Sequence, residues 1–377
     1  MDRRDAILKY ISKDDLGIEI GPWFNPIAPK RDGYNCLVLD VFDTSGLRNR
    51  ALADSSIASR AGDIEEVDLV GSSTEIDKIV EAKYPLGSFD YIVSSHNFEH
   101  LANPIRFLQG CAAVLQPGGM VSMAIPDHRT CFDFFRPLTM LTDWIDAFAQ
   151  GRERPSLMQN FHHRAFFAYY DNGTGLSTSF LRDAPVSQVV GPTNLRAVYD
   201  ELMDRINASN DEYLDTHCSA FTPGSFELLM LDCAYLRLIP FDVVEVFDAG
   251  CEFHAHLRQR ASGAAMDGAT HQRLRNALLH RMKDEEAETS QRYRLVAKER
   301  DELMRQRETE ELVHQTESRQ VQERHDSTVV ELNAERTRLL NAVGDLESLV
   351  KQYQNSTFWK ATGPFRWAAS AVRRLGS

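Results

Sequence analysis

A short apolar strand that breaks into a Gly-Pro turn, followed by a strand that ends in an acid, is the feature that most constrains this fold. Residues 17–20 lead into Gly21-Pro22, and the apolar run 36–39 ends in Asp40. The glycine lets the backbone approach a ligand, and the acid can accept hydrogen bonds from ribose hydroxyls. In an open α/β sheet such ligands lie beyond the carboxyl ends of the strands. The pattern therefore predicts a nucleotide-type pocket.

Apolar runs typical of strands recur through residues 1–260, and amphipathic stretches lie between several of them. Residues 104–115 have the apolar spacing of a helix, which Gln116-Pro117-Gly118-Gly119 then ends. This alternation predicts a mostly parallel, doubly wound α/β sheet. The expected strands are 17–20, 35–40, 67–70, 89–95, 120–125, 241–247 and 251–258. Only an Asp-Ala-Gly turn separates the last two, so we expect them to form an antiparallel hairpin at a sheet edge.

The composition excludes several classes of protein. A net charge of −13 over 377 residues argues against a nucleic-acid-binding body, whose footprint would be basic. The six cysteines include no C-x-x-C pair, which favours free thiols in a reducing cytosol. No apolar run suits a signal peptide or a membrane span. We therefore expect a cytoplasmic protein that binds no nucleic acid.

Residues 128–222 differ in character from the sheet segments around them. They are rich in aromatic and polar side chains and follow directly after an expected strand. Because they leave the carboxyl end of that strand, they can form a substrate lid over the pocket. The alternative is an insertion that packs on the sheet and has no chemical role.

From about residue 263 the composition shifts to Glu, Arg, Gln and Leu, which predicts a long helical coiled coil over 263–355. A 3-4-3-4 seam runs through Val329, Leu332, Arg336, Leu339, Val343, Leu346, Val350 and Tyr353. Arg336 is the one seam residue that is not apolar, and such a residue can fix register. We expect a homo-oligomer through 329–353. A single exposed helix is the alternative.

The tail 357–377 combines aromatic and basic residues. It holds two of the four tryptophans, and no acidic residue follows Glu347. Such a segment suits an anionic membrane surface, where cations meet lipid headgroups and tryptophan lies at their depth. The protein would then be peripheral at the inner face of the plasma membrane. The alternative is a segment that docks on a partner protein.

Residues 89–127 carry a family resemblance. They run from Phe-Asp-Tyr-Ile-Val-Ser-Ser-His-Asn-Phe-Glu-His through Val-Leu-Gln-Pro-Gly-Gly to Ala-Ile-Pro-Asp. This stretch resembles the class I S-adenosylmethionine-dependent methyltransferases, in particular a bacterial branch, and the resemblance extends from Gly17 to about Leu257. It implies a Rossmann-like methyltransferase sheet over residues 1–260, with 128–222 as the inserted lid and S-adenosylmethionine as cofactor.

The resemblance also implies roles for single residues. Glu19 and Gly21 match the motif that holds the methionine end of the cofactor, and Asp40 matches the acid that binds its ribose. Gly71 and Ser72 match the loop on the adenine side. Ser95 and His96 match the end of the fourth strand, beside the transferred methyl group.

One departure from the family pattern lies after Gly21. Most members have a second glycine there, whereas this chain continues Pro22-Trp23-Phe24-Asn25-Pro26. A tryptophan does not permit the same close backbone approach. We interpret the loop as a variant pocket. The alternative is a domain that no longer binds cofactor.

His96-Asn97-Phe98-Glu99-His100 also spells H-x-x-E-H, an inverted zinc-protease motif. That motif needs both histidines on one helix face. His96 falls at a strand end, and Asn103-Pro104 follows soon after, so no long helix carries both. We therefore expect no metal, with His96 lining the pocket.

Methyl transfer requires alignment of the acceptor with the sulfonium and in some cases a base for the acceptor's proton. Asp127, His217 and His96 are the main candidates for this base. His128, His162, His163 and Asp215 are further candidates near the expected pocket mouth.

The sequence of the tail indicates which class of acceptor the protein would methylate. Ser356 to Lys360 and Gly363 to Arg366 resemble the endings of bacterial glycosyltransferases of surface-polysaccharide assembly. We therefore expect methyl transfer to an oxygen or nitrogen of a glycan precursor or similar small molecule, with a glycosyltransferase as a possible tail partner. The alternative is a catalytically inactive methyltransferase-like scaffold that acts through its coiled coil.

Overall fold

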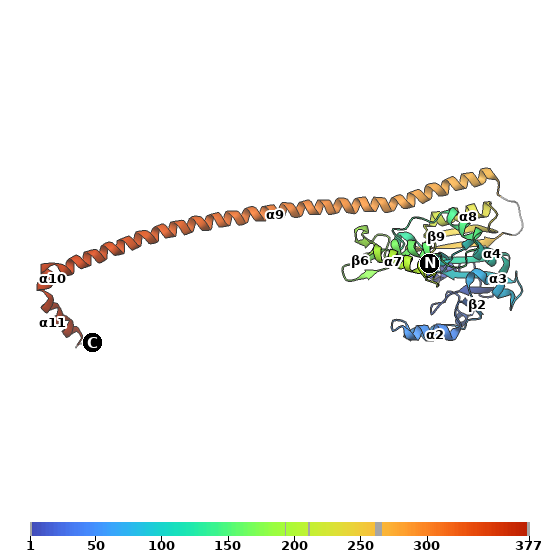
Figure 1. Ribbon diagram of the computed structural model, residues 1–377, viewed down its shortest axis with the longest axis horizontal. Helices are drawn as coiled ribbons and strands as arrows, with labels where there is room; N and C mark the ends of the chain where they lie inside the picture. The colour runs from blue at the N-terminus through green and yellow to red at the C-terminus, as the bar shows by residue number, and fades with distance from the viewer. Residues whose placement is uncertain (1, 193, 210–211, 261–265, 375–377) are drawn as a thin grey trace. The chain divides into compact units, whose positions relative to one another are not determined.

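The computed structural model describes residues 2–192, 194–209, 212–260 and 266–374. The chain divides into two compact units, Met1–Ala297 and Lys298–Ser377. Figure 1 shows the helices and strands of both units in colours that follow the chain, with labels on some of them.

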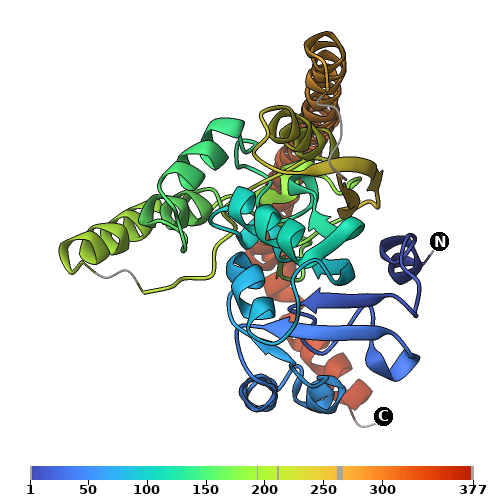
Figure 2. The same ribbon diagram turned by 90° about the vertical axis from the view of Figure 1, so that its right-hand side faces the viewer.

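A seven-stranded sheet forms the centre of the first unit, in the order β3-β2-β1-β4-β5-β10-β9 (Figure 2). Strands β1 to β5 are parallel, whereas β10 is antiparallel to both β5 and β9. The prediction of a doubly wound sheet with an antiparallel hairpin at one edge is confirmed. The strands are β1 (Leu16–Ile20), β2 (Asn35–Asp40), β3 (Leu69–Val70), β4 (Phe89–Ser95), β5 (Leu115–Pro126), β9 (Phe241–Asp248) and β10 (Glu252–Gln259).

Strand β5 begins earlier than the sequence indicated. Phe89 pairs with Leu115 and Tyr91 pairs with Met120, so residues 116–119 form an irregularity in the ladder with β4. The Gln-Pro-Gly-Gly segment therefore belongs to the strand. The preceding helix ends just before it.

The sheet is buried on both faces, as the alternation of side chains along β4 shows. Ile92 belongs to a core that includes side chains of α3, α4 and α8, while Tyr91 and Val93 belong to a second core with side chains of α1. Gly17 is required beneath Tyr91, because an added Cβ would lie 2.0 Å from the tyrosine ring. The helices around the sheet are α1 (Arg3–Ile7), α2 (Thr44–Ala53), α3 (Ile76–Glu81), α4 (Pro104–Val114) and α8 (Pro223–Tyr235).

The segment between β5 and α8 is built from short elements. Its strands form a small sheet in the order β7-β6-β8, which the sequence analysis did not predict. Trp144 anchors the segment in the main core, where its ring lies 5.7 Å from that of Phe98 and its Nε1 donates to Ser219 Oγ at 3.2 Å. The elements are α5 (Leu141–Ala149), α6 (Leu157–Ala165), β6 (Tyr169–Asp171), β7 (Leu176–Ser177), β8 (Val189–Val190) and α7 (Leu195–Asn207).

Helix α9 (Gly268–Asn355) begins within the first unit. His271 and Arg275 both bind Asp232 of α8, at 2.9 and 3.0 Å. Two turns later, Arg281 binds Glu227 at 2.8 Å. The start of α9 is therefore part of the α/β body, which the sequence analysis did not anticipate.

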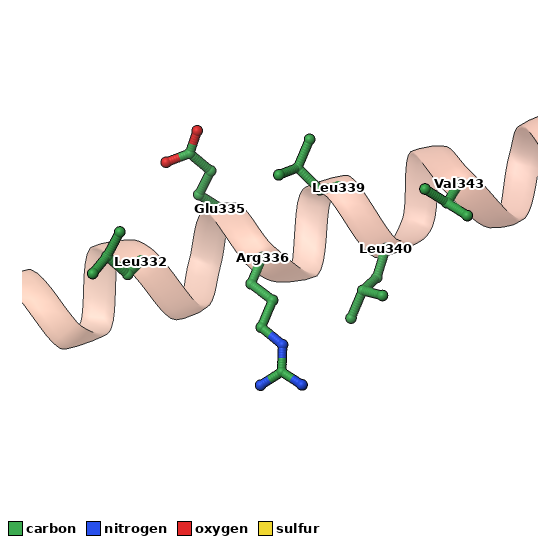
Figure 3. A pocket seen from close by; sticks show the side chains of 6 residues that line it. All are labelled: Leu332, Glu335, Arg336, Leu339, Leu340 and Val343. Atoms are coloured by element: carbon green, nitrogen blue, oxygen red, sulfur yellow. The ribbon is translucent and has the colours of Figure 1, made fainter.

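The second unit comprises the rest of α9 with α10 (Thr357–Ala361) and α11 (Gly363–Arg374). Figure 3 shows the seam of α9: Leu332 and Val343 face the viewer, with Leu339 on one side and Arg336 on the other. Leu339 is 61% exposed in the single chain. No helix among the described residues is long and apolar enough to cross a membrane.

Candidate functional site

The carboxyl ends of strands β1, β2, β3 and β4 lie next to one another in the sheet. Ile20 pairs with Leu39 on one side and with Ser94 on the other, and Asp40 pairs with Val70. The strand order reverses between β1 and β4, which is the position where doubly wound sheets bind their ligands. The fold therefore brings Gly21, Asp40, Gly71 and His96 to one edge of the sheet.

Glu19 holds the loop that follows β1. Its carboxylate is buried and accepts hydrogen bonds from the backbone N–H groups of Ile27 at 2.6 Å and Ala28 at 2.9 Å. Burial raises the pKa of Glu19 to about 7, although these two donors act in the opposite direction. Since both carboxylate oxygens accept hydrogen bonds from this loop, Glu19 fixes the conformation of the loop.

The loop itself contains two left-handed residues. Gly21 has a φ of 60°, and an added Cβ there would meet no atom within 4 Å, so the space in front of the turn is open. Trp23 has a φ of 53°, a conformation that costs a non-glycine residue roughly 1–2 kcal/mol. The tryptophan thus occupies a position with the backbone shape that glycine favours, and it packs beside Phe24 at a ring distance of 6.1 Å.

Asp40 ends strand β2 and is largely buried. Its Oδ1 accepts a hydrogen bond from the backbone N–H of Phe42 at 3.1 Å, and burial raises its pKa. The backbone carbonyls of Leu39 and Asp40 accept hydrogen bonds from Gly21 and Gly71, both at 2.9 Å. Ser72 Oγ accepts from the backbone N–H of Thr74 at 3.4 Å, so it caps the short helix that follows.

Ser95 is the last residue of β4 and His96 follows it directly, at the strand end where the sequence analysis expected them. His96 has a φ of 49°, and its Nε2 lies 2.9 Å from a carboxylate oxygen of Glu252 on β10. Arg3 donates to Ser95 Oγ at 2.9 Å and to Glu252 at 2.7 Å. Burial opposes protonation of His96, but Glu252 and Glu99 together raise its pKa. Arg3 was missed from the sequence because no local pattern connects it to the strand ends.

Asp127 lies in a buried ion pair. Its carboxylate accepts from Arg129 Nη2 at 2.6 Å and from Arg182 Nη2 at 2.9 Å, and it has no exposed surface. The carboxylate therefore forms ion pairs with two arginines. This geometry favours a structural role over that of a base.

His217 is also buried, and it is bonded to a carboxylate. Its Nδ1 lies 2.5 Å from Asp133 Oδ2, and Asp133 in turn accepts from Arg136 at 2.7 Å. Burial opposes the charge of Asp133, yet His217 and Arg136 hold its pKa well below its usual range. His217 thereby lies close to Glu99 and His100, which follow β4 in the short helix η4 (Phe98–His100).

Two of the other candidate bases, Asp215 and His163, lie near the cluster of Glu99, His100 and His217, and the remaining two lie elsewhere. Asp215 lies 2.8 Å from His100 Nδ1, and His163 lies 4.0 Å from Asp133. A cavity of about 540 Å³, lined in part by His163 and Asp215, adjoins this cluster. His162 lines a separate cavity, and His128 is enclosed, with its pKa lowered by burial.

Comparison with known proteins identifies the fold. A family model described as a methyltransferase domain matches residues 15–233, more than half of the chain. No curated protein matches.

Solved structures of S-adenosylmethionine-dependent methyltransferases are similar at low identity. One from Aquifex aeolicus is 13% identical with a TM-score of 0.33, and the match covers 68% of this chain and 89% of that chain. One from Methanosarcina mazei is 15% identical with a TM-score of 0.33, covering 69% and 99%. These scores are too low to add to the family match. On the evidence of that match, the chain belongs to the methyltransferase domain family, enzymes whose methyl donor is S-adenosylmethionine.

Proposed function

We propose that this methyltransferase acts on an oxygen or nitrogen atom of a polar acceptor, and that the acceptor is a glycan precursor. The observation that carries the proposal is the polar wall beyond the end of β4. There His96, His100 and His217 each lie within 3.9 Å of the Glu99 carboxylate, and Asp215, which lies 2.8 Å from His100, lines a cavity of about 540 Å³. Such a wall suits a hydroxylated acceptor and not an apolar one.

The strand ends fit the methyl donor. The open space in front of Gly21 and the carboxylate of Asp40 offer a close backbone approach and a ribose acceptor. S-adenosylmethionine would supply a methyl group bound to a positively charged sulfur, and the acceptor atom would attack the methyl carbon as the carbon–sulfur bond breaks. The left-handed conformation of Trp23 supports a loop that still binds cofactor. Its backbone has a conformation that glycine favours, in the loop where most family members have a second glycine.

His96 is the best-placed group to take the acceptor's proton. Its side chain is half exposed, whereas those of His217 and Asp127 are 7% and 0% exposed. Glu252 holds its Nε2, so the ring is oriented as a base needs. The other nitrogen, Nδ1, points toward Glu99 at 3.7 Å.

Cofactor binding tests the enzyme and separates it from an inactive scaffold. Asp40→Ala should weaken S-adenosylmethionine binding by about 1–3 kcal/mol, or roughly 5- to 150-fold, because charge-assisted hydrogen bonds to the ribose are lost. Calorimetry on the full chain measures this change. Asp54→Ala removes an acid at the end of α2 and serves as the control with unchanged affinity. If the parent protein binds no cofactor, the scaffold alternative gains support.

The acceptor class is tested by transfer of a labelled methyl group. We expect label on nucleotide sugars or lipid-linked sugars, and less label when Asp40→Ala replaces the parent at a cofactor concentration below the dissociation constant. If label appears only on peptides or apolar lipids, the glycan proposal fails while methyl transfer stands.

The exposed aromatic side chains of the tail support binding of the protein to a membrane surface. Phe358 and Phe365 are each 78% exposed, and Trp367 is 74% exposed. Basic residues near an anionic surface contribute about 1 kcal/mol each, and salt screens this attraction. Several tails on one oligomer would bind more strongly than one.

Removing residues 357–377 should release the protein from anionic liposomes at low salt without changing cofactor affinity. A flotation assay measures the bound fraction. Phe365→Ser with Trp367→Ser keeps every charge and should weaken binding partly, which separates the aromatic and electrostatic parts. If the full chain floats no better than the truncated one, the tail docks on a protein instead.

A further inference from the structure

Glu99 presents a buried carboxylate with no hydrogen-bond donor. It is 1% exposed, and neither of its oxygens has a hydrogen-bond partner among the described residues. Burying an unpaired carboxylate costs several kcal/mol, so such a group needs a positive partner. Its backbone is firmly placed, because Glu99 O accepts from the N–H groups of Cys218 at 2.7 Å and Ser219 at 3.0 Å.

Those two backbone hydrogen bonds bring His217 to Glu99. Glu99 Oε1 lies 3.8 Å from His100 Nε2 and 3.9 Å from His217 Nε2, and the three ligand atoms lie within 4.8 Å of one another. These distances exceed a hydrogen bond. A tetrahedral ion bound at about 2.0–2.2 Å separates its ligand atoms by roughly 3.4 Å. The two distances from Glu99 would shorten by about half an ångström on binding such an ion, and the two histidine nitrogens, which lie within 4.8 Å of one another, would approach by at most about 1.4 Å.

The opposite nitrogen of each histidine faces a carboxylate. Asp215 Oδ1 lies 2.8 Å from His100 Nδ1, and Asp133 Oδ2 lies 2.5 Å from His217 Nδ1. In metal sites, such carboxylates hold the proton on one ring nitrogen and direct the lone pair of the other toward the ion. Arg136 fixes Asp133 in turn, so the arrangement extends beyond the three ligands.

We propose that Glu99, His100 and His217 bind a divalent transition-metal ion of the Zn²⁺ type. Two imidazoles and one carboxylate suit zinc and its neighbours, and three protein ligands leave one coordination position open. His96 Nδ1 lies 3.7 Å from Glu99 Oε1, so the ion is near the residue at the end of β4. If the proposed methyl transfer is correct, the open position would hold and orient an acceptor oxygen.

Metal binding can be measured without any activity. The full chain, stripped with EDTA, should bind one equivalent of Zn²⁺ in calorimetry and should show a raised melting temperature. Co²⁺ in place of Zn²⁺ should give the visible absorption of a tetrahedral site. Glu99→Gln and His217→Ala should each weaken Zn²⁺ binding at least tenfold, and Asp133→Asn should weaken it about 10- to 100-fold.

One control variant outside the cluster and one check of folding accompany these measurements. His162→Ala removes a histidine of the same insertion outside the cluster and should leave Zn²⁺ affinity unchanged. S-adenosylmethionine binding, measured on each variant, shows that the variant is folded. If the parent binds the methyl donor but no Zn²⁺, or if folded Glu99→Gln binds Zn²⁺ as tightly as the parent, the metal site is overturned while the methyltransferase function stands.

Discussion

Urea should unfold Asp127→Ala at a lower concentration than the parent protein, with a loss of about 3 kcal/mol in the free energy of unfolding. The reason is that Arg129, which is almost fully buried, would lose the carboxylate that accepts its Nε and Nη2 hydrogen bonds. The expected loss lies at the lower end of the range for broken buried ion pairs, because both arginines retain another acidic partner. Arg129 still donates to Glu288 at 3.1 Å, and Arg182 still donates to Asp248.

Asp248→Ala is the matched control, because it removes the more exposed acid from Arg182 and should cost less than about 1 kcal/mol. Denaturation curves at one protein concentration compare the variants. The structural interpretation fails if Asp127→Ala is as stable as the parent and binds cofactor normally, yet transfers no methyl group. That result would restore Asp127 as a catalytic base.

Leu339→Asp combined with Leu346→Asp should convert an oligomer into a monomer. Each leucine is more than 60% exposed in the single chain, and an apolar seam of this spacing is covered in a coiled coil. Burying a leucine is worth about 1.5–3 kcal/mol. In a dimer the double variant removes four such side chains, so dissociation should increase by roughly 10⁴-fold or more.

Light scattering at micromolar concentration gives the mass of each form. Val330→Asp with Asn341→Asp adds the same charge on positions outside the seam and should leave the mass unchanged. A parent that is already monomeric would contradict the coiled-coil prediction. So would a double variant that keeps the mass of an oligomer.

The sheet could be predicted from sequence because its signals are local. Strands 89–95 and 241–247 are short stretches rich in aromatic and β-branched residues, and the Asp-Ala-Gly turn before β10 indicates a hairpin directly. The small sheet β7-β6-β8 escaped prediction because its strands have two or three residues and no periodicity. The docking of the first turns of α9 on α8 depends on ion pairs that no heptad pattern encodes.

The candidate site was only partly predictable, for the same reason. Gly21, Asp40 and His96 each end a strand, and parallel strands bring their ends together. Asp127 and Glu99 each have one neighbour close in sequence and one from a distant segment: Arg182 and His217 both lie in the insertion. No metal was expected, because no long helix carries both histidines of the H-x-x-E-H pattern. The fold supplies the third candidate ligand from another part of the chain.

The pairing of β5 with β10 affects how the chain folds during synthesis. β5 ends at Pro126 and β10 begins at Glu252, so β5 keeps one unpaired edge until the later strand emerges. At 5–20 residues per second, the ribosome needs roughly 6–25 s to make the intervening segment. An apolar strand edge exposed for that time invites aggregation. Because α9 is made only after β10, nascent chains must pass through this vulnerable interval before the seam of α9 exists.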